Sequence, residues 1–261
     1  MADLTGNRVM ITGAAGGIGI GLCRHFIEIG AIVLAVDINR EALARLHDAV
    51  PSERLHSDVV DLNDLADVRR AVDAFAAVQG SVDILINNAG AAAAMTLAEL
   101  SPEAWAHDLA INLTAAYYCV EAVKEAMMAA GRGVIINIGS VNGLTALGHP
   151  AYSAAKAGLV SYTRSLAIEY GPRGLRANVI CPGTVRTQAW DERAASKPEI
   201  FASLQKWYPL RQFPTPVDIA KAAAFLASDD ARMITGVVLP VDSGLTAGNG
   251  VMAAELTLGE F

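Results

Sequence analysis

The sequence contains little that would mark a secreted, membrane or nucleic-acid-binding protein. It has only 3 cysteines in 261 residues, and their spacing forms neither a CxxC pair nor a zinc-ligand pattern. No apolar run reaches the roughly 18 residues that a membrane-spanning helix needs. Acidic residues outnumber basic ones by 27 to 20, so the chain has no basic excess for nucleic acid or anionic membranes. The N-terminus also lacks a basic segment followed by an apolar one.

These absences predict a soluble, cytoplasmic protein with a small-molecule substrate, no bound metal, and neither nucleic acid nor membrane as a partner. Charged residues make up only 18% of the chain, whereas hydrophobic ones make up 53%. A parallel sheet covered on both faces would explain this balance, as would surface hidden in an oligomer. Cys23, Cys119 and Cys181 each lie in apolar sequence, and we expect them to be reduced core residues.

Short apolar, β-branched runs alternate with longer segments of helical period along the chain. The expected strands are 9–11, 32–37, 54–59, 82–86, 133–139, 176–182 and 237–242. The expected helices are 17–28, 41–50, 61–79, 101–111, 113–130 and 150–170. This alternation predicts an α/β protein with a doubly wound parallel sheet (Rossmann fold), about seven strands, and helices on both faces. We expect one domain over 1–261, with the less periodic segment 183–213 as a substrate loop or lid.

A glycine cluster, TGAAGGIG, separates the first expected strand from the first expected helix. Such a turn lets backbone N–H groups and the helix N-terminus approach a pyrophosphate. Asp37 ends the next expected strand, where a carboxylate accepts hydrogen bonds from the adenosine ribose. Asp37 would repel the 2′-phosphate of NADP, and the glycine turn holds no Lys or Arg. The sequence therefore favours NAD as the cofactor.

Tyr152 and Lys156 lie four residues apart, separated only by Ser and Ala, within an expected helix. At that spacing both side chains project from the same helix face. A tyrosine base near neutral pH needs its pKa lowered by roughly 3 units from about 10. A cation about 4 Å away supplies roughly that much at an effective dielectric constant of about 20. We therefore predict that Lys156 lowers the pKa of Tyr152.

Several short motifs occur in one order and resemble the signature of the short-chain dehydrogenase/reductase family. They are Thr12-Gly13-x-x-x-Gly17-x-Gly19, Asn87-Asn88-Ala89-Gly90, Asn112, Ser140, Tyr152-x-x-x-Lys156, and Pro182-Gly183 with Thr187. VVLPVDSG near the C-terminus resembles the family's final strand, so the likeness covers nearly the whole chain. The resemblance implies an NAD-dependent oxidoreductase acting on CH–OH groups, with hydride transfer between a substrate carbon and nicotinamide C4.

The resemblance also implies roles for the four candidate catalytic residues. Tyr152 would be the general acid/base on the substrate oxygen, and Ser140 would bind the same oxygen. Lys156 would lower the pKa of Tyr152 and bind the nicotinamide ribose. Asn112 would hold, through backbone geometry and a water, a proton path that leads to Lys156.

A larger set of residues is implied in cofactor binding. It comprises Gly13, Gly17, Ile18, Gly19, Asp37, Asp58, Val59, Asn88, Ala89, Gly90, Tyr152, Lys156, Pro182, Gly183, Val185 and Thr187. Asp58 and Val59 would contact adenine, and the Val185 backbone and Thr187 hydroxyl would hold the carboxamide. Whether Asn87 is functional or purely structural stays open.

The residues for the substrate are less determined. The candidates are Ser140, Asn142, His149, Arg186 and Trp190, with Trp207 and Tyr208 beside them. Polar and cationic groups next to aromatic ones favour a sugar, polyol or hydroxy acid. Each candidate also has a plainer interpretation: His149 as a loop residue, Arg186 and Arg193 as solvated charges, and the tryptophans as core packing.

Other activities remain open at this point. They are the oxidation of a cyclic or steroid-like apolar alcohol, 3-oxoacyl reduction, and non-catalytic dinucleotide sensing. A sugar-nucleotide epimerase usually needs a larger C-terminal region, and an enoyl reductase has a longer Tyr-to-Lys spacing. Apolar residues in 113–130 and 151–170 favour a homotetramer, and the tail 245–261 is expected to reach a neighbouring subunit.

Overall fold

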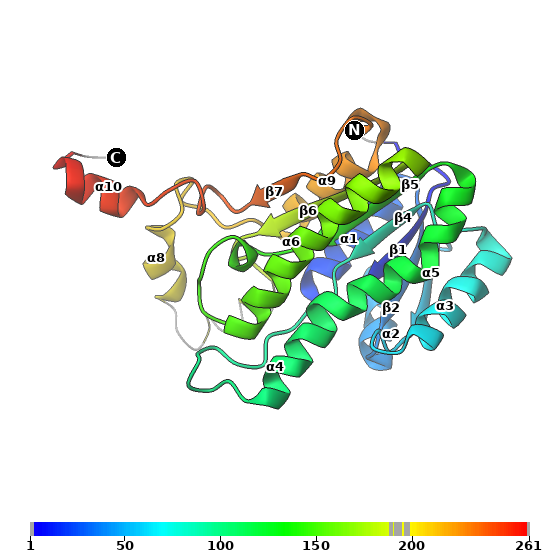
Figure 1. The fold of residues 1–261 in the computed structure, drawn as a ribbon, viewed down its shortest axis with the longest axis horizontal. Helices are drawn as coiled ribbons and strands as arrows, with labels where there is room; N and C mark the ends of the chain where they lie inside the picture. The colour runs from blue at the N-terminus through cyan, green and yellow to red at the C-terminus, as the bar shows by residue number, and fades with distance from the viewer. Residues whose placement is uncertain (1–2, 188–189, 191–194, 196–198, 260–261) are drawn as a thin grey trace.

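The computed structural model describes residues 3–187, 190, 195 and 199–259. Within them the chain forms one 7-stranded sheet in the order β3-β2-β1-β4-β5-β6-β7 (Figure 1). The strands are β1 (Arg8–Thr12), β2 (Ile32–Asp37), β3 (Leu55–Val59), β4 (Ile84–Asn87), β5 (Gly133–Ile138), β6 (Leu175–Pro182) and β7 (Val238–Val241). Every neighbouring pair is parallel, which confirms the predicted doubly wound sheet.

Helices cover both faces of the sheet (Figure 1). The helices before β5 are α1 (Gly17–Glu28), α2 (Arg40–Ala49), α3 (Leu65–Gln79), α4 (Pro102–Leu109), the π-helix η1 (Ala110–Thr114) and α5 (Ala115–Ala130). After β5 come the 3₁₀ turn η2 (Val141–Gly143), α6 (Pro150–Tyr170), η3 (Gly171–Arg173), α8 (Ile200–Gln205), α9 (Pro216–Ala227), η4 (Asp229–Ala231) and α10 (Gly250–Thr257).

The alternation of side chains along the strands divides the core into two layers. Val9 and Ile11 of β1 pack in the layer that contains Phe26 of α1 and Ile219 of α9. Met10, between them, faces the opposite layer, which the helices α3 and α5 cover. Apolar burial on both faces explains the high hydrophobic fraction without any membrane segment. Among the described residues, no helix is long and apolar enough to cross a membrane.

The structure differs from the sequence-based expectation in several helices. The two helices predicted at 101–111 and 113–130 form one continuous helical run, α4–η1–α5. The third expected helix begins at Leu65, because the Asp64 side chain accepts a hydrogen bond from the Ala66 N–H and caps it there. The periodicity does not predict helices α8, α9 and α10. Helix α10 projects away from the body of the molecule and buries none of its residues (Figure 1).

Candidate active site

Two adjoining cavities open beyond the carboxyl ends of the central strands, where the strand order reverses and doubly wound sheets bind their ligands. The larger, of about 1200 Å³, is lined by residues that follow β4, β5 and β6 and by the start of α6. The smaller, of about 440 Å³, lies against the glycine turn and the end of β2. Ile18, Asn88, Gly90 and Thr187 line both, so the two cavities form one groove.

The glycine turn allows other backbone segments to pack very closely. Gly13 has a φ of 58°, and a Cβ there would stand 2.8 Å from the Ala89 Cα. A Cβ on Gly17 would stand 2.7 Å from the Thr187 side chain, and one on Gly19 would overlap the Gly13 carbonyl oxygen. Gly13 thus permits close contact with the segment after β4, and Gly17 permits contact with the loop after β6. Gly19 permits close packing within the turn itself.

The N-terminus of α1 has the features of a phosphate site. Its N-cap, Gly16, offers no side-chain acceptor to the first N–H groups, and its first turn holds no acidic residue. Gly16, Gly17 and Ile18 line the smaller cavity. Unpaired N–H groups and the positive end of a helix dipole suit the pyrophosphate of a dinucleotide. The residues present therefore fit a nicotinamide dinucleotide cofactor.

Asp37 lies on the wall of the same cavity, at the end of β2. Its carboxylate accepts hydrogen bonds from the backbone N–H groups of Ala15, at 3.2 Å, and Asn39, at 3.0 Å. These two bonds hold the carboxylate at the mouth of the glycine turn. Among the described residues that line this cavity, none is a Lys or Arg.

Neither of the two residues predicted to contact adenine lines the smaller cavity. Asp58 does not line the cavity, because its carboxylate forms an ion pair with Arg70 at 2.7 Å. Val59, also predicted, ends β3 and is likewise absent from the cavity wall. Asp61 and Leu62 line it instead. Asp58-Val59 and Asp61-Leu62 share one pattern, an aspartate followed by an apolar residue. The two pairs differ in that β3 ends at Val59, so that only the second pair lies beyond the strand.

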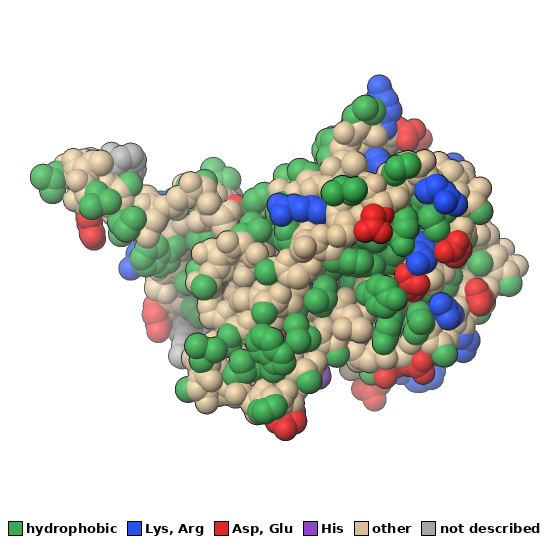
Figure 2. Space-filling model, in the orientation of Figure 1, with side chains coloured by type: hydrophobic (Ala, Val, Ile, Leu, Met, Phe, Trp, Pro, Cys, Tyr) green, Lys and Arg blue, Asp and Glu red, His purple; other side chains and the backbone are tan. Residues whose placement is uncertain are grey.

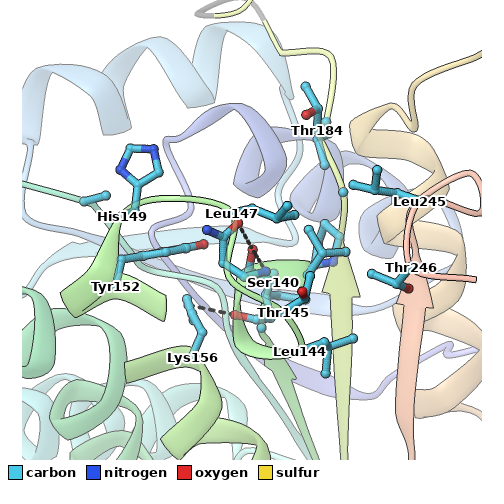
Figure 3. Close-up of a pocket in the computed structure, with 18 of the residues that line it drawn as sticks. Ser140, Leu144, Thr145, Leu147, His149, Tyr152, Lys156, Thr184, Leu245 and Thr246 are labelled. Atoms are coloured by element: carbon cyan, nitrogen blue, oxygen red, sulfur yellow. Dashed lines mark hydrogen bonds between the residues drawn. The ribbon is translucent and has the colours of Figure 1, made fainter. Parts of the chain in front are cut away.

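Ser140 follows β5 and points into the larger cavity together with Tyr152 (Figure 3). The Asn142 N–H donates to the Ser140 Oγ at 3.1 Å, which fixes the serine side chain in the turn η2. The Asn142 amide donates to the Gly148 carbonyl, at 3.1 Å, and to the Ser153 Oγ, at 3.2 Å. Asn142 lines the cavity as expected, but its side chain mainly holds the loop that carries Ser140.

Lys156 is almost completely buried at the base of the cavity, 3% exposed. Its ammonium donates to the Ile138 carbonyl oxygen at 2.9 Å and lies 5.5 Å from the centre of the Tyr152 ring. Burial lowers the pKa of Lys156 to about 8, because the charged form loses its hydration.

The surroundings of Tyr152 within the chain favour the neutral phenol. Burial raises the pKa of Tyr152, and a hydrogen bond with Ser140 opposes this rise only in part. The Lys156 ammonium donates to the Ile138 carbonyl and lies 5.5 Å from the centre of the Tyr152 ring, so its predicted effect on the pKa of Tyr152 stays a prediction. The phenol therefore rests in its protonated form at neutral pH.

Asn112 lies in the π-helix η1 and is 1% exposed. Its amide nitrogen donates to the Ala91 carbonyl, at 2.7 Å, and to the Asp108 carbonyl, at 2.9 Å. These bonds tie the widened helical turn to the loop after β4. A π-helical turn inside a longer helix is often a sign of a functional site.

The remaining cofactor candidates lie along the groove. Asn88 donates from its amide to the carbonyls of Thr12, at 2.9 Å, and Gly13, at 3.0 Å, and so joins the segment after β4 to the glycine turn. Candidate residues on the groove wall are Asn88, Gly90, Pro182, Gly183, Val185 and Thr187 on the larger cavity, and Ala89 on the smaller.

The substrate candidates separate into two groups. His149, with a φ of 50°, precedes α6, lines the larger cavity and bonds through Nδ1 to the Ala94 carbonyl at 3.1 Å. Trp190 also lines this cavity. Arg186 does not, because its exposed guanidinium lies over the Phe201 ring, 5.3 Å from its centre. Arg193 lies outside the described residues.

The structure adds cavity residues that the sequence did not single out. Thr184, Leu245 and Thr246 reach the wall from the loops after β6 and β7, and Leu144 and Leu147 reach it from the loop after η2 (Figure 3). No motif marks them, because they converge only when the strands are in place. Among the described residues, no group of His, Cys, Asp and Glu could hold a metal ion.

We expect Gly13→Ala to destabilise the protein more than Gly131→Ala. Both glycines have a φ near +60°, at 58° and 64°, so both variants bear the left-handed strain of about 1–2 kcal/mol. Only at Gly13 would the new Cβ also meet the Ala89 backbone, whereas a Cβ at Gly131 would meet no atom within 4 Å. Urea unfolding should show an additional loss of about 1–3 kcal/mol for Gly13→Ala. Equal losses would mean that the close approach does not matter.

Burial of Lys156 predicts a pH-dependent stability. Since its folded pKa is about 8 and its ordinary value is 10.5, the unfolded chain binds more protons between these two pH values. The cost of the buried charge is full below pH 8 and decreases as the pH rises toward 10.5. Relative to Lys156→Met, the wild type should gain up to about 3 kcal/mol of unfolding free energy over this range. Parallel stability curves from denaturant unfolding would contradict the prediction.

Comparison with known proteins agrees with this geometry. The family model described as enoyl-(acyl carrier protein) reductase matches residues 13–246. The chain is 40% identical to D-threitol dehydrogenase of Mycolicibacterium smegmatis, over 93% of this chain and 94% of that protein. A short-chain dehydrogenase/reductase family oxidoreductase from Burkholderia thailandensis superposes with a TM-score of 0.92 and 55% identity, covering 97% of this chain and 98% of the other.

A more distant structure contains the cofactor class that the groove fits. NAD⁺-bound xylitol dehydrogenase superposes with a TM-score of 0.85 at 27% identity, covering 91% of this chain and 98% of the other. The family model spans most of the chain, and two of the three proteins are named dehydrogenases while the third is named an oxidoreductase of the family. The chain belongs to the short-chain dehydrogenase/reductase family of oxidoreductases.

Proposed function

We propose that the protein is an NAD-dependent dehydrogenase that oxidises a secondary alcohol of an uncharged polyol or sugar. The observation that carries this proposal is the convergence of Ser140, Tyr152 and Lys156 on a cavity that adjoins the Asp37-lined groove. The cofactor, when bound, accepts a hydride at nicotinamide C4. The groove from the glycine turn to Thr187 would hold it, with Asp61 and Leu62 near adenine.

In this mechanism the chain's residues move one proton. Ser140 binds the substrate hydroxyl oxygen and orients it toward Tyr152. Tyr152 accepts the hydroxyl proton during oxidation and donates it during carbonyl reduction. The raised pKa of Tyr152 suits proton donation during carbonyl reduction. In the oxidation direction, the positive charges of Lys156 and of the oxidised cofactor would lower this pKa and favour the phenolate. Lys156 also lies at the groove wall, where it would bind the nicotinamide ribose.

The wall of the larger cavity favours an uncharged substrate. Among the described residues that line it, Lys156 supplies the one ammonium or guanidinium, and that ammonium is bonded to the Ile138 carbonyl. A carboxylate or phosphate would therefore lose its hydration with no cationic partner other than this buried ammonium. Thr145, Thr184 and His149 can bind hydroxyl groups instead. This ranks a polyol or sugar above a hydroxy acid, in line with the names of the threitol and xylitol dehydrogenases.

A second candidate substrate is a cyclic or steroid-like apolar alcohol. Leu144, Leu147 and Leu245 form an apolar part of the wall opposite Tyr152 (Figure 3). The description of the matching family model, an enoyl reductase, gains less support from the site, because Tyr152 and Lys156 are only four residues apart.

We also propose that the chain acts in the cytoplasm as a homotetramer of single-domain subunits, with 183–213 as the substrate lid. Tyr117 of α5 and Ile168 of α6 are 44% and 76% exposed. Figure 2 shows hydrophobic side chains gathered on this face of the molecule. In the lid, Trp190, Trp207 and Tyr208 line the cavity, and the Tyr208 hydroxyl donates to the Thr184 Oγ1 at 2.8 Å.

The central test is NAD reduction across matched alcohols. We expect D-threitol, xylitol and related polyols to be oxidised faster than the corresponding hydroxy acids and than cyclic or steroid alcohols. Tyr152→Phe should lower kcat/KM by about 100-fold or more, because the proton acceptor is lost. Tyr118→Phe, a half-buried tyrosine outside both cavities, should retain activity. Wild-type turnover in Tyr152→Phe would overturn the mechanism, and a preference for the acids would overturn the uncharged-substrate assignment.

The cofactor preference depends on Asp37. We expect the wild type to use NAD at least about tenfold better than NADP in kcat/KM, because like charges repel at the ribose. Asp37→Asn should reduce this preference mainly by improving the use of NADP. Asp58→Asn is the matched control, since that carboxylate is paired with Arg70 away from the groove. Equal use of both cofactors by the wild type would contradict the assignment.

A further inference from the structure

The loop after β4 carries a run of alanines, residues 91–94, into the wall of the active site. Ala91 and Ala92 line the larger cavity, together with Met95 directly after the run. An alanine side chain can neither donate nor accept a hydrogen bond. The place of this part of the wall therefore depends on the hydrogen bonds that its backbone makes.

One of these bonds comes from Asp108 of α4, a buried carboxylate that the proposed mechanism does not use. The side chain is 0% exposed. It accepts a hydrogen bond from the Ala93 N–H, which lies 3.0 Å from one carboxylate oxygen and 3.3 Å from the other. A second contact is the exposed His107 ring, whose Nδ1 lies 3.3 Å away. Because a charged acceptor bonds more strongly than a neutral one, the bond to Ala93 is a firm anchor for the loop.

The loop in turn holds His149, the residue before α6. The His149 N–H donates to the Met95 carbonyl at 2.9 Å. The His149 Nδ1 donates to the Ala94 carbonyl at 3.1 Å, since a carbonyl can only accept. Two bonds to one loop thus fix both the ring and the backbone of a residue whose φ of 50° is uncommon outside glycine.

His149 connects this loop to Tyr152. The two rings meet edge-on, with their centres 6.3 Å apart and their planes at 74°. Both side chains belong to the start of α6 (Figure 3). The His149 carbonyl accepts from the Ser153 N–H at 2.8 Å and so begins the first turn of that helix. The position of the loop consequently affects a ring on the cavity wall and the helical turn that contains Tyr152.

The two ends of the loop have anchors of their own. At its start, the Asn112 amide bridges the carbonyls of Ala91, at 2.7 Å, and Asp108, at 2.9 Å. At its end, the exposed Glu99 carboxylate accepts from the Met95 N–H at 2.9 Å. Between these ends, the Asp108 carboxylate holds the loop from the protein interior.

We infer that Asp108 is a positioning residue for the substrate side of the active site: it holds the loop 91–95 at Ala93, and the loop holds His149 beside Tyr152. Asp108 itself lines neither of the two cavities. Its importance for turnover rests on the proposed function, in which His149 binds a substrate hydroxyl. The alanine run is then a wall of the substrate site that a buried charge keeps in place.

Hydrogen exchange in the wild type tests the anchor with neither substrate nor cofactor. The amides of Ala92 and Ala93 each join two alanines, so their intrinsic exchange rates match. Within the part of the chain that the structure describes, the Ala92 N–H makes no hydrogen bond, whereas the Ala93 N–H donates to Asp108. We expect the Ala93 amide to exchange at least about tenfold more slowly. Equal rates would overturn the anchor, and this measurement requires no variant to fold.

A matched set of variants tests whether the anchor reaches His149. Asp108→Leu should remove the protection of the Ala93 amide and speed exchange at the His149 amide. Asp108→Asn, which keeps an acceptor for the Ala93 N–H, should retain both protections. Asp83→Leu is the control, because the Asp83 carboxylate pairs with Arg8 at the amino ends of the strands. Unchanged exchange at His149 in Asp108→Leu, or faster exchange there in the control as well, would overturn the inference.

Kinetics test the positioning role in turnover. Asp108→Leu should raise KM for the best polyol about tenfold and leave KM for NAD within about twofold, because the loop lies on the substrate side. Asp108→Asn should restore KM for the polyol. In a His149→Leu background, Asp108→Leu should change this KM by less than about twofold, because the path is already broken. Multiplying effects, or an equal rise in KM for NAD, would overturn the role. A wild type that oxidises no alcohol would instead refute the proposed function and leave the exchange results standing.

Discussion

The active site depends on one buried contact, the hydrogen bond from the Lys156 ammonium to the Ile138 carbonyl. It joins the helix that carries Tyr152 to the end of the strand that leads to Ser140. A buried ammonium is costly unless its donors are occupied, which is why burial lowers its pKa to about 8. The fold bears this cost beside Tyr152, on the wall of the larger cavity.

The same contact explains why the pairing of Tyr152 with Lys156 is indirect. The sequence placed the two side chains on one helix face, and this is correct. It could not show that a strand carbonyl would engage the ammonium, since Ile138 lies 18 residues away along the chain. Helical spacing predicts which side chains share a face, whereas the direction of a lysine head group depends on tertiary neighbours.

Features that depend on a few neighbouring residues could be predicted from the sequence, whereas features that depend on distant contacts could not. Local patterns predicted the strands and the glycine turn, because alternation, β-branching and glycine act within a few residues. They could not show that Asp58 pairs with Arg70 while Asp61, in a similar local sequence, lines the smaller cavity. They also left out Thr184 and Leu245, whose place on the cavity wall depends on the order of the strands.

The buried asparagines show how polar groups can make an apolar core specific. Replacing Asn87 and Asn137 by leucines would preserve the packing, yet the core would lose the directed hydrogen bonds that connect β4, β5 and α6. The Leu159 carbonyl, which can only accept, sets the donor and acceptor roles along this network. The network ends at the Asn87 Oδ1, which has no partner among the described residues. The network joins β4, β5 and α6, and its last residue, Asn87, lies on a wall that Lys156 also lines.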